Sequence, residues 1–246
     1  MSKAKYEIDI FENIEKLNVA AAEYFITLSN QVISVKGKFI VSLSGGETPL
    51  KFYSLLSTSS FKEQIQWNNI YLFWGDERVV PLDDPRNNAH QVKRILLDKM
   101  NIPSDHIHII PVQFPPQDAA KQYDKEISEF FGEKKARFDL IFLGLGENGH
   151  TASLFPGTKV INEKKAGVRS VYVEEEKMYR ITMTAPLINQ AHHILFLVTG
   201  KKKASVLKNI LKGPYHPDKY PAQLINPEKG SVKWFVDSEA ASQLNS

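Results

Sequence analysis

Short apolar runs alternate with amphipathic stretches along most of this chain. The runs at 39–43, 70–74, 138–143, 193–199 and 232–236 are typical of parallel strands that are buried on both faces. Between them, apolar residues recur every three or four positions, as at 14–28, 119–131 and 204–211, which predicts helices. This alternation predicts an α/β fold with a mostly parallel, doubly wound (Rossmann-like) sheet and helices on both faces.

Weaker patterns complete the predicted order of elements. Residues 6–10 alternate as an edge strand does, 107–110 form a short strand, and an acidic turn at 174–176 separates strands at 168–173 and 178–184. Further helices are predicted after Pro49 and at 91–100, 151–155 and 238–244, whereas 79–88 and 213–221 are predicted loops. No internal repeat or linker is visible, so we expect one domain over residues 1–246.

Composition narrows the functional class. The chain has 246 residues and no cysteine, which excludes disulfides, thiolate catalysis and cysteine-ligated metal. The net charge of +3 is too small to indicate nucleic-acid binding, and no apolar run is long enough to span a membrane. The first residues lack the apolar core of a signal peptide. We therefore expect a cytoplasmic protein that binds neither nucleic acid nor membrane. No dimerisation signal is visible, so we also expect a monomer.

Four predicted strands end in unusual loops, at 44–48, 76–78, 144–151 and 200–203. Because the carboxyl ends of parallel strands meet at one edge of a sheet, these loops are expected to converge there, where α/β proteins bind ligands. The convergence would bring together a glycine-rich loop, a carboxylate, a histidine and a lysine. Histidine titrates near neutral pH, so His150 is the first candidate for a general base.

Each of these residues also has a structural interpretation. His150 can simply cap the following segment, Asp76 can cap a turn, and Glu77 can pair with Arg78. The lysines at 201–203 are by default a solvated helix start. His192 and His193 flank a buried strand and are expected to be structural, and the spacing of His106, His108 and His216 is not that of metal ligands.

The loop at 44–48 joins a strand to a helix, so its backbone N–H groups and the helix N-terminus favour an anion. It is not a Walker loop, because no Lys-Ser/Thr follows the second glycine, and it is not GxGxxG. The Gly144-Leu145-Gly146 sequence lies late in the chain and departs at its third position, which argues against a dinucleotide. Neither a cofactor nor a metal ion is expected.

At these residues the chain resembles the 6-phosphogluconolactonase family, within the wider group of sugar-phosphate isomerases and deaminases. Five blocks match in order: SLSGGETP at 42–49, WGDERVVPLDDPRNN at 74–88, GLGENGHTASLFPG at 144–157, YRITMTAPLIN at 179–189 and GKKKA at 200–204. The HTASLFP sequence is the most specific, because the related deaminases continue differently after Gly-His. Two positions depart: Asn148 replaces the usual Asp, and Asn87 replaces the usual Ser. An amide is not a carboxylate partner for His150, which puts a His–Asp relay in doubt.

The resemblance implies hydrolysis of 6-phospho-glucono-1,5-lactone to 6-phosphogluconate, the second step of the oxidative pentose phosphate pathway. It implies that His150 takes a proton from water and returns it to the leaving ring oxygen, with Asp76 orienting His150 or a sugar hydroxyl. Backbone N–H groups of a glycine-rich loop are expected to stabilise the oxyanion. The expected substrate and phosphate contacts are Ser44, Gly45, Gly46, Thr48, Arg78, Asn88, Asn148, Arg180 and Lys203.

Two other functions stay open. A sugar-phosphate isomerase or deaminase needs a base at a C–H bond, and Asp76 can serve as one. HTASLFP argues against that chemistry. A phosphosugar-binding module without catalysis is the other alternative. The presence of Asp76, Arg78 and His150 argues against it, whereas Asn148 leaves room for it.

Overall fold

The computed structural model describes residues 6–132 and 134–244. Within these residues, seven parallel strands form the main sheet in the order β1-β10-β9-β6-β2-β3-β5. The mostly parallel α/β fold is thereby confirmed, and β1 lies at the edge of the sheet as its alternating pattern predicts. The strands are β1 Tyr6–Phe11, β2 Phe39–Leu43, β3 Ile70–Trp74, β5 Ile107–His108, β6 Leu140–Leu143, β9 His193–Val198 and β10 Ser231–Asp237.

A second, antiparallel sheet in the order β4-β8-β7 lies beside the main one. Its strands are β4 Asp76–Arg78, β7 Val168–Val173 and β8 Met178–Met183. The strands at 168–173 and 178–183 are thus confirmed, with the turn Glu174–Glu176 between them. The loop predicted at 76–78 is instead a three-residue strand, because its backbone pairs with β8, with Asp76 opposite Thr182. A strand this short has no recognisable period in the sequence.

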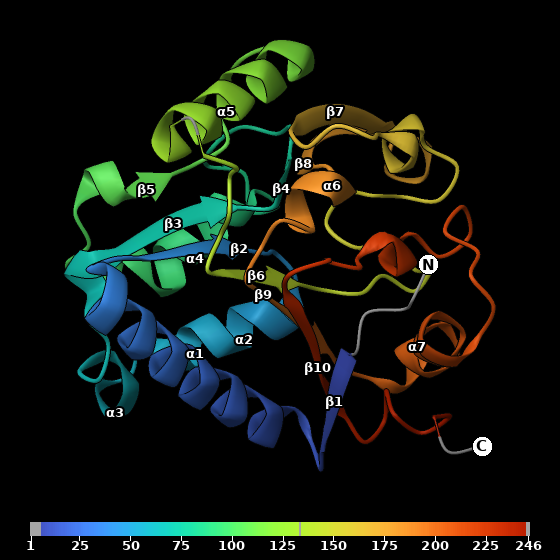
Figure 1. The fold of residues 1–246 in the computed structure, drawn as a ribbon, viewed down its shortest axis with the longest axis horizontal. Helices are drawn as coiled ribbons and strands as arrows, with labels where there is room; N and C mark the ends of the chain where they lie inside the picture. The colour runs from blue at the N-terminus through green and yellow to red at the C-terminus, as the bar shows by residue number, and fades with distance from the viewer. Residues whose placement is uncertain (1–5, 133, 245–246) are drawn as a thin grey trace.

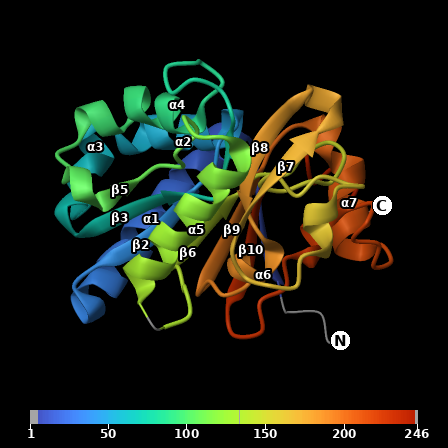
Figure 2. The ribbon, with the colours of Figure 1, turned by 90° about the horizontal axis from the view of Figure 1, so that it is seen from above.

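Helices cover both faces of the main sheet. Figure 1 shows α1 and α2 on one side, with α5 and the small sheet on the other. Viewed from above, α5, β7 and β8 lie over the main sheet (Figure 2). The helices are α1 Ile14–Lys36, α2 Glu47–Leu56, α3 Ser59–Lys62, α4 Asn88–Ile95, α5 Pro116–Phe131, α6 Ala185–Ile188 and α7 Ala204–Lys212.

Capping residues decide where the longer helices begin and end. The Asn13 side chain accepts a hydrogen bond from Lys16 N at the start of α1, which ends at Gly37 with φ of 74°. Asn87 likewise accepts from His90 N at 2.8 Å, so α4 begins at Asn88. The helix predicted at 91–100 therefore starts earlier than expected, and it stops at Ile95.

Two predicted helices are wrong. Residues 151–155 contain the isolated bridge between Thr151 and Leu154, and 238–244 form turns after β10. At 151–155 the chain turns back because Ala152 adopts a φ of 46°, which no α-helix contains. At 238–244, the Asp237 carboxylate accepts from Ala240 N at 2.8 Å and from Gly200 N, so it holds the turn against the end of β9.

The buried hydrophobic side chains form one continuous cluster that extends from Leu17 to Leu244. Its centre is aromatic: Phe25, Phe52 and Phe142 pack against one another, with ring centroids 5.0 to 6.2 Å apart. The main sheet is packed on both faces, so the loops at its carboxyl edge have a fixed base. No described helix has both the length and the apolar composition that crossing a membrane requires.

Candidate active site

The segments that follow β2, β3, β6 and β9, which are three loops and the short strand β4, meet around one cavity of about 730 Å³, as the parallel topology predicts. The loop after β2 lines one part of it, residues 144–147 after β6 line another, and the turn after β9 lines a third. The expected residues that line it are Ser44, Gly45, Gly46, Thr48, Asp76, Arg78, Asn88, His150, Arg180 and Lys203. Asn148 is not on the cavity wall, but it contacts His150 from behind.

A tight turn after β6 presents the His150 ring to this cavity. Gly146 N donates to His150 O at 2.8 Å, and Gly149 N donates to Gly146 O at 3.0 Å. Gly149 has a φ of 84°, a conformation that favours glycine. Gly146 is required for space, because a Cβ there would lie 2.1 Å from His150 Nδ1. Phe155 stacks on the imidazole with ring centroids 3.9 Å apart.

Asn148 fixes which nitrogen of His150 carries the proton. The backbone N–H of His150 donates to Asn148 Oδ1 at 3.2 Å, so the oxygen of this amide must face the histidine. His150 Nδ1 lies 2.6 Å from the same oxygen, and only a protonated Nδ1 can donate to it. The neutral ring therefore keeps an unprotonated Nε2. An amide thus orients His150 as a carboxylate would, but without supplying charge.

The surroundings of His150 keep it neutral. Burial, followed by the charges of Arg180, Lys203 and Arg78, lowers the pKa of His150 from 6.5 to about 3. At neutral pH the ring therefore has a free lone pair on Nε2 and can accept a proton. The same cations oppose the imidazolium that would form, so they must be balanced when the base acts.

Asp76 and Arg180 belong to one buried network. Asp76 Oδ2 accepts from Ser153 Oγ at 2.6 Å and lies 3.6 Å from Arg180 Nη1. Arg180 also donates from Nε to Glu176 Oε2 at 2.9 Å and pairs with it through Nη2. Among the described residues, His150 is hydrogen-bonded through its side chain to Asn148 and not to Asp76. Asp76 thus lines the cavity while it is hydrogen-bonded to Ser153, and Arg180 is largely occupied by its two carboxylate partners.

Arg78 and Asn88 form a second pair at the cavity wall. Arg78 Nη1 donates to Asn88 Oδ1 at 2.6 Å, and Asn88 Nδ2 donates to Asp76 O at 3.0 Å. Asn88 approaches the glycine-rich loop so closely that a Cβ on Gly45 would lie 1.9 Å from its Oδ1. An ion pair between Glu77 and Arg78 was one structural interpretation of the sequence. The Glu77 carboxylate instead accepts from backbone N–H groups at the start of α4, and burial raises its pKa to about 7.

The glycine-rich loop leads into the N-terminus of α2, where Gly46 provides no side-chain cap. Thr48 Oγ1 lies 2.6 Å from Thr199 Oγ1, which joins this loop to the end of β9 and brings Lys203 to the same part of the cavity. Ser44 Oγ is buried, with no hydrogen-bond partner in the described part of the chain. Free backbone N–H groups, a lysine and an unpaired hydroxyl together suit an anion.

The sequence analysis assigned no role to several residues of the site. Ser153 and Phe155 lie inside the HTASLFP sequence, but the predicted helix there gave them no role. Glu175 and Glu176 were treated only as a turn, although Glu175 contacts Asn148 and Glu176 contacts Arg180. The sequence does not show which distant loop a turn residue touches, so these contacts required the structure.

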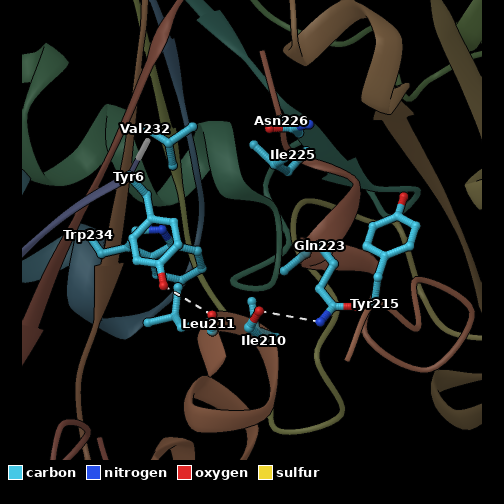
Figure 3. A pocket seen from close by; sticks show the side chains of 10 residues that line it. Tyr6, Ile210, Leu211, Tyr215, Gln223, Ile225, Asn226, Val232 and Trp234 are labelled. Carbon is cyan, nitrogen blue, oxygen red and sulfur yellow. Dashed lines mark hydrogen bonds between the residues drawn. The ribbon is translucent and has the colours of Figure 1, made fainter. Parts of the chain in front are cut away.

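A smaller cavity of about 380 Å³ lies between β1, β10 and α7 (Figure 3). Its wall is mainly apolar and aromatic, and two of its polar side chains are hydrogen-bonded to α7. Tyr6 Oη donates to Leu211 O at 3.0 Å, and Gln223 Nε2 donates to Ile210 O at 3.3 Å. None of the four strand-end loops lines it. Within the described residues, no group of three His, Asp or Glu side chains is placed to hold a metal ion.

The sequence matches the family model described as glucosamine-6-phosphate isomerases/6-phosphogluconolactonase over residues 12–234. The chain belongs to this family. The 6-phosphogluconolactonase of Haemophilus influenzae is 39% identical over 204 residues, which cover 83% of this chain and 87% of that protein. That of Synechocystis sp. is 35% identical over 243 residues, covering 97% and 98%. Membership of the glucosamine-6-phosphate isomerase/6-phosphogluconolactonase family confirms the resemblance found in the sequence.

Solved structures of this family agree with the fold. The 6-phosphogluconolactonase from Trypanosoma cruzi superposes with a TM-score of 0.89 at 27% identity, covering 100% of this chain and 99% of that one. The description of the family names two activities, and both act on phosphorylated six-carbon sugars. The arrangement of groups around His150 must therefore decide between hydrolysis of a lactone and isomerisation of an amino sugar.

Proposed function

We propose that this protein hydrolyses 6-phospho-D-glucono-1,5-lactone to 6-phospho-D-gluconate. The observation that carries the proposal is the hydrogen bond between His150 Nδ1 and Asn148 Oδ1, which leaves Nε2 free for a proton in the same cavity as a loop suited to an anion. The named relatives that cover most of the chain are 6-phosphogluconolactonases, which supports a lactone rather than an amino sugar as substrate.

In the proposed reaction His150 Nε2 takes a proton from water as the water oxygen attacks the lactone carbonyl. The resulting imidazolium returns the proton to the ring oxygen when the C–O bond breaks, so the base is regenerated. One water is consumed: one of its protons ends on the former ring oxygen, and the other is released to solvent when the new carboxylic acid ionises to the carboxylate. Asp76 lies within the same cavity and accepts a hydrogen bond from a sugar hydroxyl, which keeps the carbonyl near His150.

The substrate phosphate binds at the N-terminus of α2, where it meets Lys203 and the Ser44 hydroxyl. Burial is the main cause of the low pKa of His150, and the nearby cations lower it further. Two negative charges at the phosphate site offset those cations. Substrate binding therefore makes the imidazolium less unfavourable at the step that needs it. Arg180 is engaged with Glu176 and Asp76, so it contributes to phosphate binding through its charge more than through free N–H groups.

Lys203→Ala is expected to raise KM for the lactone about ten- to a hundredfold, because hydrogen bonds to charged groups contribute about 1.5–3 kcal/mol. The value of kcat should change little, since Lys203 does not touch the reacting carbonyl. Steady-state kinetics checks this, with the exposed Lys164→Ala as the matched control. An unchanged KM for the Lys203 variant places the phosphate elsewhere.

Asn148→Asp is expected to raise the pKa of His150, because a carboxylate next to Nδ1 favours the charged ring. The base works only when it is unprotonated, so activity is lost as pH falls through this pKa. The acid limb of the kcat/KM profile should therefore move to higher pH than in the wild type, whose limb follows a pKa of about 3. Coincident acid limbs in the two proteins contradict this account of residue 148.

The function itself is tested by giving the wild-type protein two substrates. Lactone produced in place by glucose-6-phosphate dehydrogenase is followed through 6-phosphogluconate dehydrogenase, above the spontaneous rate. Ammonia release from glucosamine 6-phosphate is measured in parallel. Acceleration of lactone opening without ammonia release is expected. Ammonia release alone overturns the proposal in favour of a deaminase, and phosphosugar binding without either reaction leaves a binding module.

We further propose that the whole chain works as one domain and as a monomer in the cytoplasm. The single hydrophobic cluster from Leu17 to Leu244 supports one domain. The cavity is built from one chain's residues, which is consistent with a monomer that is active by itself. Light scattering on the active protein measures the assembly, and a stable dimer would contradict the monomer.

A further inference from the structure

We propose that Glu175 is a positioning residue for His150 and acts through Asn148, so that His150, Asn148 and Glu175 form one relay. Asn148 Nδ2 donates to Glu175 Oε2 at 3.4 Å, and Asn148 Oδ1 accepts from the ring of His150 at 2.6 Å. The relay ends on a carboxylate, as a His–Asp pair does, but the carboxylate is one residue further from the ring. The proposal rests on the proposed function.

The chemistry of an amide explains why a third member is needed. When His150 takes a proton it becomes a cation, and Asn148 has no net charge to stabilise it. A carboxylate that accepts from Nδ2 polarises the amide and makes Oδ1 a stronger acceptor for the Nδ1 proton. The bond is long at 3.4 Å, and catalytic hydrogen bonds commonly tighten when substrate binds.

The positive charges around the His150 ring increase the need for a carboxylate that stabilises the imidazolium. Arg78, Arg180 and Lys203 all oppose the imidazolium. Asp76 and Glu176 are committed to Arg180, whereas Glu175 is joined to the hydrogen-bond chain that reaches Nδ1.

The fold fixes the position of Glu175. It belongs to the turn Glu174–Glu176 between β7 and β8, which ends at Lys177 with a φ of 50°. The next residue in the turn, Glu176, is tied to Arg180 on β8. This tie anchors the turn to the small sheet, so the backbone of Glu175 is held where its exposed side chain reaches Asn148.

The first test removes the charge and keeps the shape. Glu175→Gln should lower kcat about three- to tenfold with KM unchanged, since the lost interaction is one weak charge-assisted hydrogen bond and Glu175 is not on the cavity wall. Glu174→Gln is the matched control: it removes the same charge from the same turn, and the Glu174 carboxylate makes no hydrogen bond or ion pair with any described residue. Its kcat should equal that of the wild type.

The second test repeats the change in the Asn148→Asp background. The new carboxylate would itself stabilise the charged ring of His150 and would face Glu175 as a like charge. In that background Glu175→Gln should cause no loss of kcat, and relief of the repulsion can raise it. A loss in the wild-type background that disappears in the Asn148→Asp background is the signature of a relay, whereas a purely structural role predicts the same loss in both. Mass spectrometry should confirm that residue 148 of the wild type is still an amide, because it precedes a glycine.

An unchanged kcat for Glu175→Gln in the wild-type background overturns the proposal, and so does an equal loss in both backgrounds. Failure of the proposed function would look different: the wild-type protein itself would not accelerate lactone opening above the spontaneous rate. The two failures are therefore distinguishable in one assay series.

Discussion

Replacing His150 by glutamine is expected to lower kcat for lactone opening by about 10²–10⁴-fold, the usual contribution of a general acid–base group. Glutamine retains a polar side chain that can hydrogen bond to Asn148, but it cannot take a proton from water at neutral pH. The phosphate-binding residues stay in place, so calorimetry should show that 6-phosphogluconate still binds. The rate is measured in the coupled assay after subtraction of spontaneous hydrolysis.

His216→Gln provides the control for this substitution, because His216 is exposed and lies outside the walls of the cavity. It should leave both kcat and product affinity as they are in the wild type. If the His150 variant kept the wild-type kcat, His150 would have no part in proton transfer, whatever its geometry.

Gly146→Ala is the second change with a large expected effect. Its methyl group would lie 2.1 Å from His150 Nδ1, so the imidazole or the turn that holds it must move. A displacement of about 1 Å can lower the rate about 10²-fold, because the base no longer faces the attacking water. The fold should survive with a loss of about 1–3 kcal/mol in the free energy of unfolding, as for other overpacked sites.

Gly144→Ala tests whether the fall in kcat comes from this clash or from any methyl group added to the loop. Gly144 comes two residues earlier, has no positive φ, and a Cβ there meets no atom within 4 Å. We expect kcat and the free energy of unfolding to stay near the wild-type values, with at most a rise in KM from the methyl group in the cavity. Kinetics and urea unfolding of both variants test the contrast, and an equal fall in kcat would argue against the Gly146–His150 clash as the cause.

The main sheet was predictable because long buried strands have a clear apolar pattern. The strands at 39–43, 70–74 and 193–198 were found within a residue or so, and their parallel order then placed the active-site loops together. Strand β4 was not predictable, because three residues carry no period and its pairing with β8 joins parts of the chain about a hundred residues apart.

The two helices that were wrongly predicted show how tertiary contacts override local preference. Residues 151–155 have a reasonable helical composition. However, Ser153 N donates to Thr182 Oγ1 and Ser153 Oγ to Asp76, so this segment is tied to the small sheet instead. The predicted site residues other than Asn148 line one cavity because the predicted parallel strands bring their loops together. The hydrogen-bond partners of these residues were not predicted. That Asn148 faces Glu175, or that Arg180 is engaged by Glu176, depends on side-chain contacts that the sequence does not specify.

The proposed reaction requires His150 to be a neutral base with its proton on Nδ1 and its lone pair on Nε2. Nitrogen-15 NMR of histidine-labelled protein measures this directly, with the His150→Gln protein used to assign the signal. At about pH 7 we expect a protonated Nδ1 and an unprotonated Nε2 for His150. We also expect the ring to stay neutral well below pH 6.5, the pKa of an ordinary histidine. A doubly protonated ring at neutral pH, or a proton on Nε2, would exclude His150 as this base.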